Sequence, residues 1–206
     1  MSIFSRKKII YTNDAAGPQP WWKRSLAFLG ELVEVALVVT VIVVPIRYFL
    51  IQPFYVKGAS MEPNFYDNQY LIIDEISYRF REPARGEIIV FRYPKDESQF
   101  FIKRVIGLPG DIVTVTGGKV YIQAKNAAAS RVLDESSYLP AGLLTTGEET
   151  VTLNAGEYFV LGDNRSASLD SRFFGIVPQK DIVGRVALRG WPIDQVKTFT
   201  PPNYGF

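Results

Sequence analysis

The chain has 206 residues, 47% of them hydrophobic, and its 23 lysines and arginines nearly balance its 21 aspartates and glutamates. This length suits one catalytic domain with a short appendage, and the near-neutral charge gives no sign of a nucleic-acid partner. The sequence contains no histidine and no cysteine, which excludes an imidazole base, a thiol nucleophile, disulfides and the usual zinc ligands. Any hydrolase chemistry must therefore use Ser, Thr, Lys, Tyr or carboxylates.

The first apolar element follows a polar start. Residues 1–24 contain five lysines or arginines and are expected to form a cytoplasmic segment, and the composition then becomes strongly apolar over 25–50. Because a helix needs about 20 mostly apolar residues to cross a bilayer, the sequence predicts one transmembrane helix over 25–50. Its charged residues, Glu31, Glu34 and Arg47, are expected near the membrane surfaces, since a charge at the bilayer centre costs about 2.5–3.5 kcal/mol on insertion scales.

Two alternatives to a membrane helix are a buried helix of a soluble domain and a cleaved signal peptide. No second helical pattern of similar strength follows that could pack around a buried helix, and no small-residue cleavage site ends the apolar stretch. Both observations favour a membrane anchor. The basic residues before the helix predict a cytoplasmic N-terminus and an external remainder.

Beyond residue 50 the apolar residues fall in short runs, separated by turn signals such as Pro109-Gly110 and Gly117-Gly118. This pattern predicts a mostly β domain over 51–206, with an antiparallel sheet. Residues 123–150 differ, because they are rich in small and polar residues with little periodicity, and we expect an insertion or small lobe there. The expected strands are 70–73, 87–91, 100–106, 112–115, 119–122, 157–161 and 182–188.

Without a histidine, a serine nucleophile would need a lysine as its base. A lysine amine has a pKa of about 10.4 in water, and burial in apolar surroundings lowers that pKa. The two-residue period of a strand places Phe101, Lys103 and Val105 on one face. These neighbours favour a lowered pKa for Lys103 and a role as general base. The alternative is an edge-strand lysine that discourages aggregation.

A candidate nucleophile, Ser60, follows two small residues, Gly58 and Ala59, and Pro63 comes soon after it. Small residues let a substrate backbone approach closely, and they leave backbone N–H groups free to face an oxyanion. This arrangement fits a nucleophilic serine. A simple turn after the apolar helix accounts for the same residues, since Gly, Ser and Pro are common in turns.

A dense polar loop, 162–172, follows the apolar run 157–161. Its charged groups and hydroxyls would make sense beside a functional site, where such groups fix one another through hydrogen bonds. The alternative is a solvated loop with local turns. The loop is therefore a third candidate segment, after Ser60 and Lys103.

Four segments, in this order, resemble the motifs of bacterial type I signal peptidases. The similarity extends from about Glu34 to Trp191 and implies an antiparallel β-sheet catalytic domain of the signal-peptidase type after one transmembrane helix. Four ordered motifs are far more specific than any one of them. The segments are Ser-Met-x-Pro at 60–63, Arg-Gly-Glu-Ile-Ile-Val-Phe at 85–91, Lys-Arg-Val-Ile-Gly-Leu-Pro-Gly-Asp at 103–111 and Gly-Asp-Asn-Arg-x-x-Ser-x-Asp-Ser-Arg at 162–172.

The resemblance implies a serine endopeptidase in which Ser60 is the nucleophile and Lys103 the general base. Ser168 resembles the hydroxyl that orients the lysine amine, and the Ser60 N–H would form half of the oxyanion hole. Some family members have a serine at the position of Gly58 whose hydroxyl completes that hole, so the second donor stays open here. The family also favours threonine at the position of Asn64. Two supporting ion pairs are implied, Asp163 with Arg104 and Asp170 with Arg172.

The implied reaction removes N-terminal signal peptides from secreted preproteins, without a cofactor or a metal ion. Cleavage is expected after small residues, typically Ala-x-Ala, with the peptide bound as an extended strand beside 54–58 and 101–103. The implied location is the bacterial cytoplasmic membrane, with the lipid bilayer and preprotein signal peptides as partners and no nucleic acid. Shallow substrate pockets are expected near Phe54, Val56, Met61, Phe65, Phe101 and Ile102.

The short connection after the apolar helix has a mechanical consequence. Ser60 follows Arg47 by 13 residues, which span at most about 43–47 Å when fully extended, so Ser60 is expected near the outer leaflet. Two other functions remain open: a non-catalytic, membrane-tethered binding protein with the same fold, and a related Ser/Lys protease such as a self-cleaving repressor or a conjugation-specific processing enzyme. A repressor is disfavoured because no helix-turn-helix pattern precedes Ser60.

Overall fold

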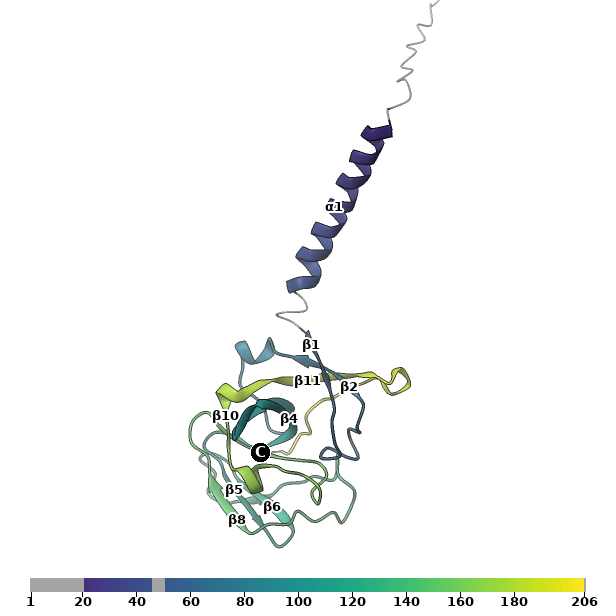
Figure 1. Cartoon of the computed structure of the whole chain (residues 1–206). Coiled ribbons are helices and arrows are strands. Elements are labelled where there is room, and N and C mark those ends of the chain that lie inside the picture. Colours follow the sequence, from purple (N-terminus) through teal and green to yellow (C-terminus); the bar gives the residue numbers. More distant parts are fainter. Residues whose placement is uncertain (1–20, 46–50, 206) are drawn as a thin grey trace, which may run out of the picture. The chain divides into compact units, whose positions relative to one another are not determined.

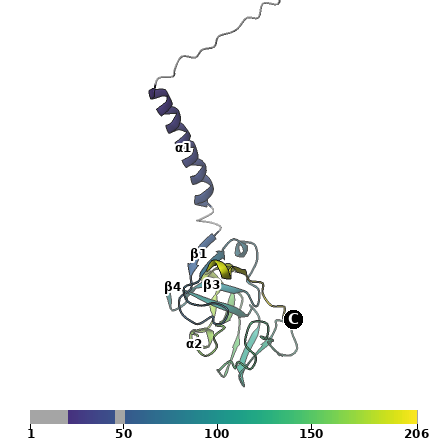
Figure 2. The same cartoon turned by 90° about the vertical axis from the view of Figure 1, so that its right-hand side faces the viewer.

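The computed structural model describes residues 21–45 and 51–205, which fall into two units, one with helix α1 and one with all the strands (Figures 1 and 2). Residues 1–20 and 46–50 lie outside the described residues. They include most of the expected cytoplasmic segment and the expected C-terminal end of the membrane helix.

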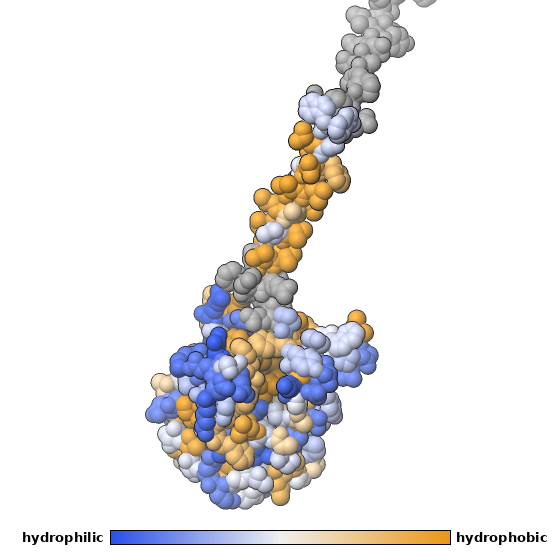
Figure 3. Space-filling view, viewed as in Figure 1, coloured by the Kyte–Doolittle hydropathy of each residue, from blue (hydrophilic) through white to orange (hydrophobic). Residues whose placement is uncertain are grey.

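Helix α1 (Trp21–Pro45) contains 25 residues, and its segment Ser25–Val44 has a mean hydropathy of 2.4. None of this segment is buried in the protein, and apolar side chains cover most of the visible face of α1 in Figure 3. At 1.5 Å per residue the helix is about 37 Å long, which is enough to cross a hydrocarbon core of about 30 Å. Its length and composition fit a membrane anchor.

The larger sheet of the second unit is antiparallel and has eight strands. This confirms the predicted fold class, a mostly β, antiparallel domain with one apolar helix before it. In spatial order the strands are β1 (Ile51–Tyr55), β2 (Tyr70–Asp74), β11 (Ile182–Trp191), β3 (Ile88–Tyr93), β4 (Asp96–Gly107), β9 (Glu157–Leu161) and β10 (Val177–Pro178), with β12 (Lys197–Thr198) paired to β11.

A second, four-stranded sheet lies at the opposite end of this unit from β1, β2 and β11 (Figure 1). Its first hairpin turns at Gly117-Gly118, where φ angles of 55° and 76° suit glycine. The segment 123–150 supplies one strand of this sheet and the start of another. In spatial order the strands are β7 (Arg131–Val132), β6 (Lys119–Gln123), β5 (Ile112–Thr116) and β8 (Glu149–Thr152). Short helical segments are α2 (Ser171–Phe174) and the 3-10 turns Ser77–Arg79, Gln179–Asp181 and Ile193–Gln195.

Strand β4 lies where three clusters of buried apolar side chains meet. Ile106 belongs to a cluster shared by the two sheets, and Val105 belongs to a cluster with residues of β3 and β9. Ile102 packs against a third cluster, which contains Met61 and Phe65. Successive residues of a strand point to opposite faces, so Ile102 and Ile106 lie on one face of β4 and Val105 on the other. Both faces are packed against apolar clusters, and the polar residues of β4 in this region are therefore carried into the interior.

Candidate active site

Lys103 lies in β4 and is only 3% exposed. Its Nζ donates hydrogen bonds to Ser60 Oγ at 2.8 Å and to the Ile102 carbonyl at 2.9 Å. Burial lowers the pKa of Lys103 from 10.5 to about 8, although the negative charges of Asp170 and Asp163 act in the opposite direction. An amine with this pKa is partly neutral at mildly alkaline pH and can accept a proton.

Ser60 lies in the turn region between β1 and β2, and the polar loop 162–172 holds it there. The Asn164 backbone N–H donates to the Ser60 carbonyl, and the Asn164 side chain donates to the Ala59 carbonyl, each at 3.1 Å. The Ser60 N–H makes no hydrogen bond within the described part of the chain. That N–H is therefore available to an oxyanion.

Gly58, the other candidate for the oxyanion hole, already uses its N–H. This group donates to Asp67 Oδ1 at 2.7 Å. The φ angle of Gly58 is 89°, a conformation that favours glycine over residues with a side chain. In this structure the Gly58 N–H thus stabilises the turn, and it is not free to act as a second donor to an oxyanion.

Ser168 is 7% exposed, and its Oγ has no hydrogen-bond partner among the described residues. It packs closely against Gly162, since a Cβ added to Gly162 would lie 2.1 Å from Ser168 Oγ and 2.5 Å from the Ser60 carbonyl oxygen. The structure therefore brings Ser168 beside the backbone of Ser60, but it records no hydrogen bond between Ser168 and Lys103.

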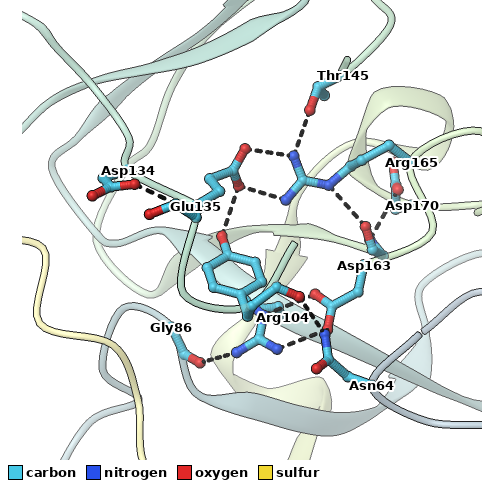
Figure 4. A network of polar contacts seen from close by, with 12 residues as sticks. Asn64, Gly86, Arg104, Asp134, Glu135, Thr145, Asp163, Arg165 and Asp170 are labelled. Atoms are coloured by element: carbon cyan, nitrogen blue, oxygen red, sulfur yellow. Dashed lines mark hydrogen bonds and ion pairs between the residues drawn. The ribbon is translucent and has the colours of Figure 1, made fainter. Parts of the chain in front are cut away.

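Asp163 and Arg104 form a buried ion pair with two hydrogen bonds, Nε to Oδ1 at 2.8 Å and Nη2 to Oδ2 at 2.7 Å (Figure 4). Asn64 donates to the same carboxylate at 2.8 Å, and Arg104 also donates to the Gly86 carbonyl at 2.9 Å. The asparagine in place of the family's threonine is thus part of this network. Each buried charge has a partner of opposite sign, as burial requires.

Asp170 and Arg172 form a second buried pair, with hydrogen bonds from Arg172 Nε and Nη2 to the carboxylate at 2.8 Å each. The Asp170 carboxylate also accepts the Gly162 N–H at 3.0 Å. Arg172 Nη2 donates in addition to the Arg165 carbonyl at 2.9 Å. This pair therefore connects the first residue of the loop 162–172 to its last.

Arg165, a buried residue of this loop, and three residues of the segment 123–150 that contact the network have no role predicted from the sequence. Arg165 contacts Glu135 and Thr145, and Tyr138 lies with its ring 4.0 Å from the Arg104 guanidinium carbon. Arg165 belongs to the motif at 162–172, and only this membership indicates a role for it near the site. No local pattern connects it to Glu135, 30 residues earlier.

A groove of about 600 Å³ opens beside Ser60 and Lys103. Four residues of the predicted pockets line it: Phe54, Val56, Phe101 and Ile102. Met61 and Phe65 instead lie in the core, 1% and 0% exposed, and do not line the groove. Within residues 21–45 and 51–205, no three acidic side chains are grouped so that they could hold a metal ion.

Comparison with known proteins assigns the family. Residues 29–191 match the model described as signal peptidase, peptidase S26. A probable signal peptidase I-2 of Synechocystis is 39% identical over 175 residues, which cover 82% of this chain and 77% of that protein. The signal peptidase IB of Staphylococcus aureus is 31% identical over 166 residues, which cover 75% of this chain and 86% of that protein. A crystal structure of a signal peptidase I from Enterococcus faecalis is 34% identical and covers 52% of this chain and 97% of its own, with a TM-score of 0.41. The family indicated by the motifs is confirmed: the chain belongs to the S26 signal peptidases and is a type I signal peptidase, an enzyme that cleaves signal peptides.

Proposed function

We propose that this signal peptidase uses Ser60 as nucleophile and Lys103 as general base. The observation that supports this dyad is the 2.8 Å hydrogen bond from Lys103 Nζ to Ser60 Oγ, made by a buried amine whose pKa is lowered to about 8. Neutral Lys103 takes the Ser60 proton while Oγ attacks the carbonyl carbon before the scissile bond. The resulting ammonium protonates the leaving amine. Lys103 then deprotonates a water molecule that attacks the acyl carbonyl carbon, and it returns this proton to Ser60 Oγ as the bond between Oγ and the acyl group breaks.

The tetrahedral intermediate needs donors for its oxyanion. The Ser60 N–H is the first donor in this proposal, because it has no acceptor within the described residues. Gly58 stays the second candidate, and Asp67 must release the Gly58 N–H when substrate binds for this donor to contribute.

The substrate is expected to add to the sheet as an extended strand. Strand β4 pairs with β9 only from Arg104 onward, so residues 100–103 present an edge that no described strand occupies, and β1 lies at the end of the sheet. The groove lies along both segments, and an extended peptide can bind such edges through its backbone. The groove is lined by the bulky rings of Phe54 and Phe101, and we expect it to accept small side chains, as Ala-x-Ala specificity requires.

The anchor is proposed to be α1, inserted once in the bacterial cytoplasmic membrane. Five lysines or arginines in residues 1–24 favour an internal N-terminus and an external catalytic domain. Anchoring the enzyme and the signal peptide in one bilayer raises their effective concentration. The preprotein and the bilayer are thus the two partners in this proposal.

Incubation of the detergent-solubilised enzyme with a preprotein tests the proposal. The wild-type enzyme should produce a new N-terminus directly after a small residue, and Ser60→Ala and Lys103→Ala should each abolish this product. Ser130→Ala and Lys180→Ala are matched controls, because Ser130 is exposed and the Lys180 side chain is 73% exposed. Near-normal cleavage by Lys103→Ala would show that Lys103 is not the base.

A further inference from the structure

The guanidinium of Arg165 is buried in the protein and held almost entirely by the segment 123–150. Its side chain is 0% exposed. Nη1 donates to Glu135 Oε2 at 2.8 Å and to Thr145 Oγ1, and Nη2 donates to Glu135 Oε1 (Figure 4). Arg165 Nε donates to the Gly162 carbonyl at 2.9 Å. An arginine is charged at any physiological pH, so the Glu135 carboxylate is the counter-ion of a charge with no access to water.

Gly162 links the contacts of Arg165 to the residues around the dyad. Its carbonyl is held by Arg165 and its N–H by Asp170. The space where a Cβ would lie is already filled, 2.1 Å from Ser168 Oγ and 2.5 Å from the Ser60 carbonyl oxygen. With contacts this close, a small displacement of Gly162 must move Ser168 or the Ser60 backbone as well.

Glu135 also reaches the other side of the site. Its Oε1 accepts a hydrogen bond from Tyr138 Oη at 2.7 Å, and the Tyr138 ring covers the Arg104 guanidinium at 4.0 Å. The Tyr138 carbonyl accepts from Asn64 Nδ2, which donates to Asp163 as well. One carboxylate of the segment 123–150 is therefore connected both to the loop 162–172 and to the buried pair of Asp163.

We propose that Glu135 is a positioning residue for peptide-bond cleavage, which acts through Arg165 and Gly162 to hold Ser60 and Ser168 in register with Lys103. This inference rests on the proposed dyad. The segment 123–150 then has a role in catalysis although it contributes no group to the groove. Removal of the carboxylate leaves the buried Arg165 charge without the partner of its ion pair, so we expect the loop to move toward water.

The variant Glu135→Gln tests this role, with preprotein cleavage measured for kcat and KM separately. We expect kcat to fall about tenfold to hundredfold, as displacement of reacting groups by up to about 1 Å does, while KM stays near the wild-type value because the groove is unchanged. A loosened loop also hydrates Lys103, which raises its pKa, and the charges of Asp170 and Asp163 act in the same direction, so the alkaline rise of kcat should move to higher pH. Asp134→Asn is the matched control, because Asp134 is exposed and bonds Ser136 locally.

The outcomes separate this role from mere stabilisation. If Glu135→Gln keeps the wild-type kcat and pH profile, the proposal is overturned, whatever happens to its Tm. If Glu135→Gln does not fold, Thr145→Val decides: it removes one Arg165 contact at nearly unchanged shape, and kcat should fall about fivefold, the effect of one hydrogen bond. A wild-type kcat for Thr145→Val would then overturn the proposal. Ser60→Ala in the same assay tests the proposed dyad by itself. Near-normal turnover by this variant would contradict the proposed nucleophile, whatever the result for Glu135→Gln.

Discussion

Lys103 Nζ and Ser60 Oγ meet at 2.8 Å although 43 residues separate the two along the chain. Lys103 belongs to the long strand β4, and Ser60 lies in the turn region after β1, so their contact depends on the pairing of the whole larger sheet. The amine is buried and the hydroxyl borders the groove. The pair thus joins a base protected from water to a nucleophile that a peptide can reach.

The rate should depend on the protonation of Lys103. Its pKa is lowered to about 8, mainly by burial. Because the neutral amine is the active form, kcat/KM should rise as pH increases from 6, with a midpoint near the value of this pKa. Measurement of kcat/KM from pH 6 to 10 on a preprotein checks this. A rate that does not change across that range would contradict a titrating lysine base.

Lys103→Met should remove activity and make the protein more stable at pH 7. The pKa of Lys103 falls from 10.5 in the unfolded chain to about 8 in the folded protein, so below pH 8 the folded state carries the full cost of burying this amine. That cost is about 3 kcal/mol. The stabilisation by Lys103→Met should be smaller than this, because the variant also loses the hydrogen bonds of Lys103 Nζ. As pH rises from 8 to 10.5 the wild-type protein regains this stability, so the difference between the two proteins should shrink. Denaturant unfolding at pH 7 and pH 10 measures it, and a less stable variant at pH 7 would contradict the expectation.

Ser168→Ala should separate catalysis from stability. The Ser168 hydroxyl is buried without a partner among the described residues, so its removal should leave the free energy of unfolding unchanged or slightly raised. If the hydroxyl orients the Lys103 amine during the reaction, kcat should fall about tenfold or more. Ser130→Ala is the control, because Ser130 is an exposed serine outside this loop. Loss of stability with unchanged kcat would show that Ser168 is only a packing residue.

Gly162→Ala should impair the enzyme strongly. The added Cβ would lie 2.1 Å from Ser168 Oγ and 2.5 Å from the Ser60 carbonyl oxygen. The loop or the nucleophile must shift, and we expect kcat to fall about a hundredfold with a loss of about 1–3 kcal/mol in the free energy of unfolding. Gly190→Ala is a matched control, because its nearest atom is 3.5 Å away. Equal activities of the two variants would contradict close packing at Gly162.

Features that depend on local periodicity were accessible from the sequence. Each of the seven expected strands coincides with an observed strand within a few residues. The alternation in β4 also placed Lys103 among apolar neighbours, because side-chain direction in a strand follows from position alone. The short strands β7, β10 and β12 have two residues each, too few to show any period.

Features that depend on tertiary pairing were not accessible. Met61 and Phe65 are apolar residues near Ser60, and no local pattern shows that they point into the core rather than the groove. The contact between Glu135 and Arg165 joins a segment without periodicity to a loop, so neither residue signals the other. The hydrogen bond from Gly58 to Asp67 likewise arises from the folded turn.

The dyad itself is tested most directly by comparing Ser60→Ala, Lys103→Ala and the double variant in one preprotein-cleavage assay. Residues that act as one unit have non-additive effects, so losing either should cost about as much as losing both. If the two residues act as a dyad, all three variants should have the same residual rate. Their Tm values should lie within a few degrees of the wild-type Tm. A double variant much slower than both single variants, or a Lys103→Ala enzyme close to the wild-type rate, would contradict the dyad.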